Sequence, residues 1–136
     1  MGIGSDLACS IRQPAGHCGI VGLKPTHGRV PLTGHWPDTL LRFMHVGPMA
    51  RTVEDVALAL TLMAGPDGAD PYASPVPPPR FEDLGGELPE LRVGWCAEGP
   101  FSPVAREVQD TVSEAARALE ELGCLVESVS LSAWED

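Results

Sequence analysis

The last third of the chain contains a helical pattern between two short apolar segments, and this arrangement restricts the fold more than any other feature of the sequence. Apolar residues recur at spacings of 4, 4, 3, 4 and 3, at Val104, Val108, Val112, Ala115, Leu119 and Leu122. The pattern predicts an amphipathic helix that begins at Ser102-Pro103 and ends at Gly123. The flanking segments, Leu91–Cys96 and Cys124–Leu131, are predicted strands. Two strands joined by one helix are expected to lie parallel in a sheet, with a right-handed crossover.

A second helix is predicted from Thr52 to Ala64. Thr52 can cap the first turn, and Asp55 occupies the capping-box position three residues later. Beyond that turn the segment is apolar almost all round, which is typical of a helix buried on several sides. Gly65-Pro66 is expected to end the helix.

The remaining segments show no regular period. Residues 1–47 are rich in Gly, Ser, Thr, Pro and His and contain only one short apolar stretch, Ile20–Leu23. We therefore expect a long irregular segment, which in a compact domain is more often functional than idle. A proline-rich run in residues 72–90 predicts a stiff surface linker. The predicted organisation is residues 1–71, a linker over 72–90, and a strand–helix–strand unit of the same domain over 91–136.

Length and charge exclude several classes of protein. With 136 residues, of which 43% are hydrophobic, the chain can bury a core. No apolar run approaches the ~20 residues of a membrane-spanning helix, and Met1–Arg12 shows no signal-peptide pattern. Nine Lys/Arg against 19 Asp/Glu give a net charge of −10, which argues against nucleic acid or an anionic membrane as a partner. We therefore expect a cytoplasmic protein.

Residues 4–15 combine small side chains and hydroxyl groups with one acid, Asp6, and one base, Arg12. Small residues let backbone N–H groups approach a ligand closely, and N–H groups aimed at one point stabilise a developing oxyanion. A serine in such a segment is a candidate nucleophile if a base removes its proton. On composition alone, a turn with locally satisfied hydroxyl groups is the stronger interpretation.

The order of the residues changes that interpretation. Residues 4–30 read GSDLACSIRQPAGHCGIVGLKPTHGRV, and residues 47–55 read GPMARTVED. Both strings strongly resemble landmarks of the amidase signature family, and Ala64-Gly65-Pro66-Asp67 and Asp70-Pro71 fit the loop that follows them. The resemblance implies an α/β fold with a mixed central sheet covered by helices, of which this chain supplies an incomplete part.

The resemblance also implies site residues. Family members hydrolyse or transfer amide groups through a covalent acyl-enzyme, using a serine nucleophile, a second serine with a cis peptide bond, and a lysine. By position, Ser10 matches the nucleophile, and Asp6 and Arg12 match residues that brace its loop. The family's oxyanion hole corresponds to backbone N–H groups of Leu7, Ala8, Cys9 and Ser10. No cofactor and no metal is implied.

Two departures from the family pattern qualify this expectation. The family normally carries Gly-Gly where this chain has Ala8-Cys9, and any positive φ there would cost ~1 kcal/mol or more. The family's second serine and its lysine lie upstream of the motif, and neither Ser5 nor Lys24 substitutes for them by position. Because a serine without a base is a poor nucleophile, we expect the isolated chain to be inactive.

The cysteines and histidines have simpler interpretations. Cys96 and Cys124 are predicted to be buried small residues on strands, whereas Cys9, beside Ser10, is a candidate reactive thiol. The four histidines are His17, His27, His35 and His45. Their spacing matches no metal-binding pattern, so we interpret them as turn residues with ordinary hydrogen bonds. Trp36 and Phe43 either line an acyl pocket or pack under a loop.

The sequence thus predicts an amidase acting on a small-molecule amide, with Ser10 attacking the carbonyl and residues 7–10 stabilising the oxyanion. One alternative within the family is the glutamine-hydrolysing A-type subunit of an amidotransferase, although residues 38–46 look more like those of general bacterial amidases. Another is a non-catalytic remnant or scaffold, favoured by Ala8-Cys9 and the missing triad residues. Because the 52–64 helix needs neighbours on several sides, we also expect self-association through exposed core.

Overall fold

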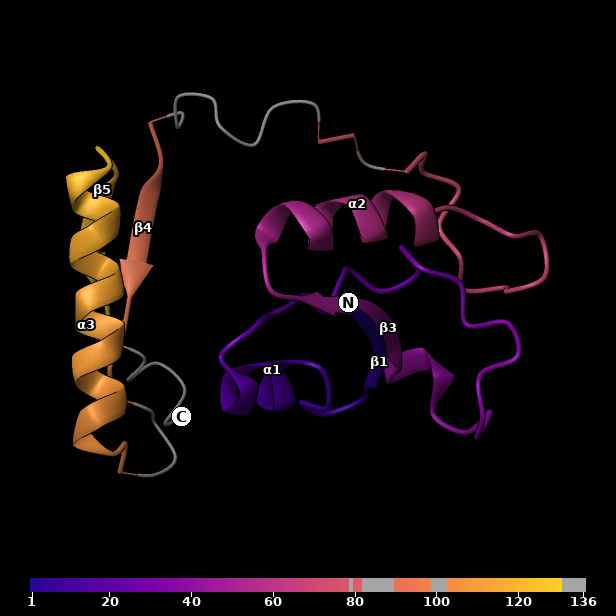
Figure 1. The fold of residues 1–136 in the computed structure, drawn as a ribbon, viewed down its shortest axis with the longest axis horizontal. Coiled ribbons are helices and arrows are strands. Elements are labelled where there is room, and N and C mark those ends of the chain that lie inside the picture. Colours follow the sequence, from indigo (N-terminus) through magenta and orange to yellow (C-terminus); the bar gives the residue numbers. More distant parts are fainter. Residues whose placement is uncertain (79, 82–89, 99–102, 131–136) are drawn as a thin grey trace. The chain divides into compact units, whose positions relative to one another are not determined.

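A three-stranded antiparallel sheet organises the first part of the chain (Figure 1). Its central strand, β3 (His45–Ala50), lies between β1 (Gly2–Asp6) and β2 (Val21–Gly22). In the β1–β3 register Asp6 is opposite His45. The last residue of β1 is thereby fixed against the first residue of β3.

The structure is a computed structural model that describes residues 1–78, 80–81, 90–98 and 103–130. The chain divides into two units, Met1–Leu84 and Gly85–Asp136, and the division falls within the predicted linker. The first part of that linker contacts the first unit, since Arg29 Nη1 donates a hydrogen bond to the Pro77 carbonyl (3.1 Å). The expected arrangement of all three segments in one domain stays a prediction.

Two helices pack against the sheet of the first unit. α1 (Arg12–Cys18) contacts β2, and α2 (Val53–Met63) contacts both β3 and β2. A short 3-10 helix, η1 (Leu41–Phe43), precedes β3. No helix in the described ranges has the length and apolar character needed to cross a membrane.

The centre of this unit is packed closely around Gly47 and Pro48. Pro48 is fully buried, and its carbonyl accepts a hydrogen bond from the Leu23 N–H (3.0 Å). A Cβ atom on residue 47 would overlap the Leu23 carbonyl oxygen, so glycine is required where the two segments meet. Ile11 and Asp6 are the other large, fully buried side chains.

The second unit confirms the predicted parallel strand pair. β4 (Arg92–Trp95) and β5 (Leu125–Ser128) are parallel, with Arg92 opposite Leu125, and α3 (Arg106–Glu121) connects them. α3 packs against β5. The whole chain is therefore a mixed α/β protein, as expected.

The prediction that residues 1–47 are irregular is wrong, because this segment contains β1, α1, β2 and the start of β3. Two glycines hide the strand pattern of β1, and its partner β3 follows only about 40 residues later in the chain. α1 has seven residues, with Pro14 in its first turn and Gly16 inside it, so no helical period is visible.

The predicted boundaries of the last helix and strands also need correction. α3 begins at Arg106 rather than at Ser102-Pro103, and Ala105 precedes it without a side-chain cap. Ser102 lies outside the described residues, as does Leu131, the predicted end of the last strand. Gly123 does end the helix region, with a φ of 91° that favours glycine.

The predicted helix over 52–64 is confirmed with its cap. Thr52 Oγ1 accepts a hydrogen bond from the Asp55 N–H (3.2 Å), and α2 ends at Met63. Four residues of the helix are buried, namely Val56, Ala57, Ala59 and Leu60. The expectation of burial on several sides is not met within this unit, because Leu58 is 60% exposed and Leu62 is 76% exposed.

Replacing the cap should destabilise the first unit. Thr52→Ala removes the acceptor of the Asp55 N–H, so we expect a loss of about 1 kcal/mol in the free energy of unfolding. Thr52→Ser keeps an acceptor oxygen and is the matched control. Urea titration followed by circular dichroism measures both, and equal stability of Thr52→Ala and the wild type would contradict the prediction.

The exposed leucines of α2 should drive self-association. Leu58 and Leu62 lie one helical turn apart on the same exposed face, so replacing both with Gln should shift the chain toward the monomer. Glu54→Gln, an exposed change on the same helix, serves as the control. Sedimentation velocity across a concentration series provides the measurement. A wild-type chain that stays monomeric and melts sharply would contradict the expectation.

Candidate active site

Residues 7–10 form a short loop between β1 and α1. Two backbone hydrogen bonds start the helix, from Gln13 N–H to the Cys9 carbonyl (2.8 Å) and from Ala15 N–H to the Ile11 carbonyl (3.1 Å). Ser10 therefore lies where the loop becomes helical, one residue before the first cap position, Ile11. We call residues 7–10 the nucleophile loop, after the nucleophile that the sequence predicts at Ser10.

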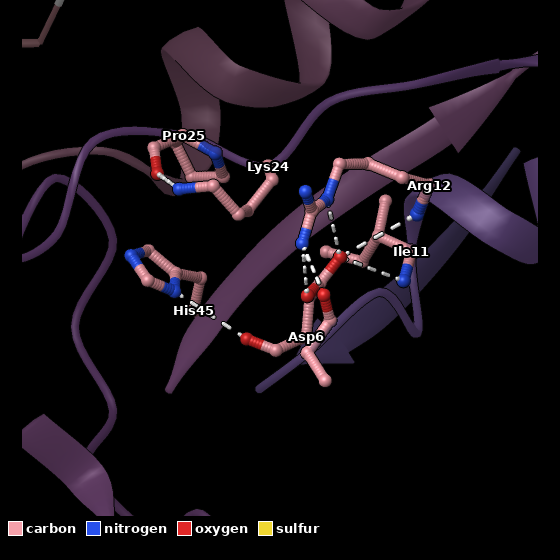
Figure 2. A network of polar contacts seen from close by, with 7 residues as sticks. Asp6, Ile11, Arg12, Lys24, Pro25 and His45 are labelled. Atoms are coloured by element: carbon pink, nitrogen blue, oxygen red, sulfur yellow. Dashed lines mark hydrogen bonds and ion pairs between the residues drawn. The ribbon is translucent and has the colours of Figure 1, made fainter. Parts of the chain in front are cut away.

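A buried carboxylate holds both ends of this loop (Figure 2). Asp6, which is 0% exposed, accepts hydrogen bonds at Oδ2 from the Ile11 N–H (3.1 Å) and from Arg12 Nε (3.1 Å). Its Oδ1 accepts from Arg12 Nη2 (3.0 Å), which makes the contact bidentate. Arg12 Nη2 also donates to the Ala8 carbonyl (2.6 Å), so the middle of the loop is held as well.

The same contacts decide the charge of this pair. The pKa of Asp6 is lowered to about 2, chiefly by the hydrogen bond from the Arg12 side chain. Burial opposes this effect, and the Ile11 and Arg12 N–H groups contribute to the lowering. The carboxylate in turn raises the pKa of Arg12. Both groups are therefore charged at neutral pH. The bracing role of Asp6 and Arg12 in a reaction stays a prediction.

The residues predicted to supply the nucleophile and the oxyanion donors are consecutive, and all are exposed except Cys9, which is half-buried. Ser10 is exposed, and its Oγ has no hydrogen-bond partner in the described ranges. Over the same residues, no protein acceptor receives the N–H groups of positions 7–10. Leu40 is the one described non-glycine residue with a positive φ, so Ala8 and Cys9 carry no strain of that kind.

Three neighbours of the loop were not predicted from the sequence. His45 Nδ1 lies 3.4 Å from the Asp6 carbonyl oxygen, and the His27 ring stands edge-on to the His45 ring with centroids 5.5 Å apart. Lys24 Nζ donates to the Pro25 carbonyl (3.1 Å) in the same region (Figure 2). Burial lowers the pKa of His45 first, and the positive charge of Lys24 lowers it further. One signal was present in the sequence, because His45 stands two residues before the GPMARTVED string.

The remaining histidines and the two aromatic residues singled out in the sequence do not form a single site. His17 lies in α1 and His45 lies in β3, so the prediction that the histidines are turn residues is wrong for these two. Each of the four histidines does have a hydrogen-bond contact, as expected. Among the described residues, no three His, Cys, Asp or Glu side chains are grouped as a metal site would require. Trp36 is 85% exposed and Phe43 is 60% exposed, so neither packs under the loop.

The strand cysteines are only partly as predicted. Cys124 is buried but precedes β5, and Cys96 follows β4, is half-buried and donates from Sγ to the Glu98 carbonyl (2.8 Å). Cys9 is half-buried and is a free thiol. Its reactivity stays a prediction.

Comparison with known proteins places this loop in context. The family model described as Amidase matches residues 1–136. The chain is 43% identical to the A subunit of glutamyl-tRNA(Gln) amidotransferase from Shouchella clausii and 44% identical to the same-named protein of Akkermansia muciniphila. Each match covers 95% of this chain and 27% of the relative, so the chain spans about a quarter of the length of these relatives.

Solved structures agree with the family model. A bacterial aryl acylamidase described as an amidase signature enzyme superposes with a TM-score of 0.83 at 33% identity, over 95% of this chain and 26% of that one. The A subunit of glutamyl-tRNA(Gln) amidotransferase from Thermotoga maritima gives a TM-score of 0.72 at 33% identity, over 93% of this chain and 28% of that one. The match of the family model to the whole chain, together with these structures, shows that the chain belongs to the amidase signature family.

Proposed function

We propose that this segment supplies the nucleophile loop of an enzyme that hydrolyses amide C–N bonds of a small molecule in the cytoplasm. The observation that carries the proposal is the Asp6–Arg12 contact, which holds residues 7–10 from both ends while leaving Ser10 exposed. A preorganised loop of this kind holds its N–H donors in place before substrate binds, which is the arrangement that stabilises an oxyanion most effectively.

The proposed reaction has two steps. Ser10 Oγ attacks the amide carbonyl carbon, the C–O bond forms, and the C–N bond breaks as the amine leaves with a proton. Water then hydrolyses the resulting ester and returns the serine. In both steps the backbone N–H groups of residues 7–10 donate to the carbonyl oxygen while it carries negative charge.

The proton of Ser10 needs a base that this segment does not provide. No described side chain is hydrogen-bonded to Ser10 Oγ, and the resemblance assigns the base to a lysine and a second serine upstream. We therefore propose that the base comes from chain outside these 136 residues and that the isolated chain is inactive.

A second candidate function is glutamine hydrolysis for a partner enzyme. It is favoured by relatives at 37–44% identity that are named as the A subunit of glutamyl-tRNA(Gln) amidotransferase. Residues 12–15 and 19–26 are compatible with that subgroup, whereas residues 38–46 are more like those of general amidases. Release of ammonia from glutamine by a full-length protein that contains this segment would favour the second candidate.

Removing the Ser10 hydroxyl should abolish covalent labelling. The test protein is a chimera in which these residues replace the matching quarter of the bacterial aryl acylamidase, so that the host supplies the remaining groups. A fluorophosphonate probe should label the chimera, and Ser10→Ala should remove the label, because Oγ is the attacking atom.

Two controls sharpen this test. Cys9→Ala should keep the label, which excludes reaction at the neighbouring thiol, and the isolated wild-type chain should stay unlabelled. An unlabelled but folded chimera would favour the non-catalytic remnant. Ser10-dependent amide turnover by the isolated chain would contradict the proposed external base.

Neutralising Asp6 should weaken the loop and change the response to acid. A carboxylate whose folded pKa lies near 2, below its ordinary 3.8, stabilises the fold above about pH 4 and loses that contribution as the pH falls toward 2. Asp6→Asn leaves Arg12 without its partner, so we expect roughly 2 kcal/mol lower stability at pH 7 and a flatter decline below pH 4. Urea titrations from pH 7 to pH 3 measure both effects.

Asp67 offers a matched control for the effect of Asp6. Its pKa is also lowered to about 2, first by a hydrogen bond with Thr33 and then by the Asp70 and Ala69 N–H groups, but it lies in another loop. Asp67→Asn should flatten the acid decline without reducing the labelling of Ser10 in the chimera, whereas Asp6→Asn should reduce it. Equal labelling of the two variants would contradict the bracing role of Asp6.

A further inference from the structure

His45 contacts the first peptide of the nucleophile loop from the side opposite to Arg12. Figure 2 shows the Asp6 carbonyl directed toward the His45 ring, while the Asp6 carboxylate is directed toward Arg12. The distance from His45 Nδ1 to that carbonyl oxygen is 3.4 Å, and the ring is half-buried. Because a carbonyl oxygen only accepts, this contact is a hydrogen bond when Nδ1 carries the proton.

The Asp6 carbonyl and the Leu7 N–H belong to one planar peptide unit, in which they point in opposite directions. A donor that fixes the oxygen therefore fixes the direction of the N–H. The carboxylate contacts of Asp6 hold its side chain, Ile11 and Ala8. The β1–β3 pairing holds the backbone of Asp6 up to the end of the strand, and the His45 ring adds a side-chain contact to the carbonyl of this peptide. The Leu7 N–H is the first of the predicted oxyanion donors and has no protein acceptor over the described ranges.

We propose that His45 is a positioning residue, whose Nδ1–H holds the Asp6 carbonyl and thereby orients the Leu7 N–H toward the oxyanion. The inference rests on the proposed function, because it assigns His45 a purpose in that reaction. His45 belongs to β3 and is opposite Asp6 in the β1–β3 register, so the sheet itself places the ring against this peptide.

The surroundings of His45 favour its neutral form. Lys24 and His27 face the ring, and the Asp6 carboxylate is paired with Arg12. The backbone groups of Asp6 and Phe43 raise the pKa of His45, but burial and the charge of Lys24 lower it by more. Protonation would place a second positive charge beside Lys24. Since the folded pKa lies below the ordinary 6.5, the contribution of His45 to stability is present above that value and declines as the pH falls below it.

NMR of the 136-residue chain tests the orientation directly. We expect long-range ¹H–¹⁵N spectra to show His45 with its proton on Nδ1. His45→Leu should shift the Leu7 amide resonance, and His45→Asn, whose amide places a donor near the position of Nδ1, should restore it. A proton on Nε2, or a Leu7 amide resonance that His45→Leu leaves unchanged, would overturn the proposal.

Labelling of the chimera tests the consequence. His45→Leu should slow fluorophosphonate labelling by about tenfold, less than the ~10²–10³-fold expected for losing a whole oxyanion donor. His45→Asn should restore the rate and should lack the decline in stability below pH 6.5. His35→Leu is the matched control, because His35 Nδ1 also contacts a backbone carbonyl, that of Pro37 at 3.2 Å, away from the loop.

The two proposals fail in different ways. Ser10-dependent labelling that His45→Leu slows no more than His35→Leu does would overturn the role of His45 and leave the proposed function standing. A wild-type chimera without Ser10-dependent labelling would overturn the proposed function and, with it, the catalytic purpose of His45. In that case the NMR comparison would still decide whether His45 orients the peptide.

Discussion

The contact between the buried Asp6 carboxylate and the half-exposed Arg12 holds the loop between β1 and α1. Asp6 ends β1, Arg12 begins α1, and their side chains join the two elements across the nucleophile loop. Without the contact, a loop of small and exposed residues would have little to select one conformation, because its own side chains bury almost nothing. The ion pair therefore replaces the hydrophobic packing that normally fixes a loop.

This solution has a thermodynamic cost that the surrounding contacts offset. A carboxylate removed from water is unfavourable unless its oxygens are fully hydrogen-bonded. Asp6 meets that condition with a bidentate guanidinium and the Ile11 N–H, and no buried side-chain polar atom in the described ranges is left without a partner. The side of Arg12 that faces solvent keeps the pair from being completely desolvated, since the Arg12 side chain is 47% exposed.

The sequence predicted those elements whose signals are local. The cap and length of α2 follow from residues near one another in the chain, and the β4–α3–β5 unit follows from a clear helical period between two apolar segments. β1 and β3 were missed because neither strand has an alternating or continuous apolar pattern of its own, so nothing in the sequence marks the two segments as partners. The positions of Ser10, Asp6 and Arg12 came from the family resemblance. The contact of His45 depends on the β1–β3 register, which no local pattern specifies.

The proposed catalytic groups fall into two sets, one close together in the sequence and one that comes from elsewhere in the fold. The nucleophile, the oxyanion donors and their brace all lie within residues 6–12, so a segment this short can assemble them. The base must approach Ser10 from elsewhere in the fold, and the exposed leucines of α2 show that this unit leaves apolar surface uncovered. Under the proposed function, a chain that spans about a quarter of the length of its relatives supplies the nucleophile, and the rest of the fold supplies the base.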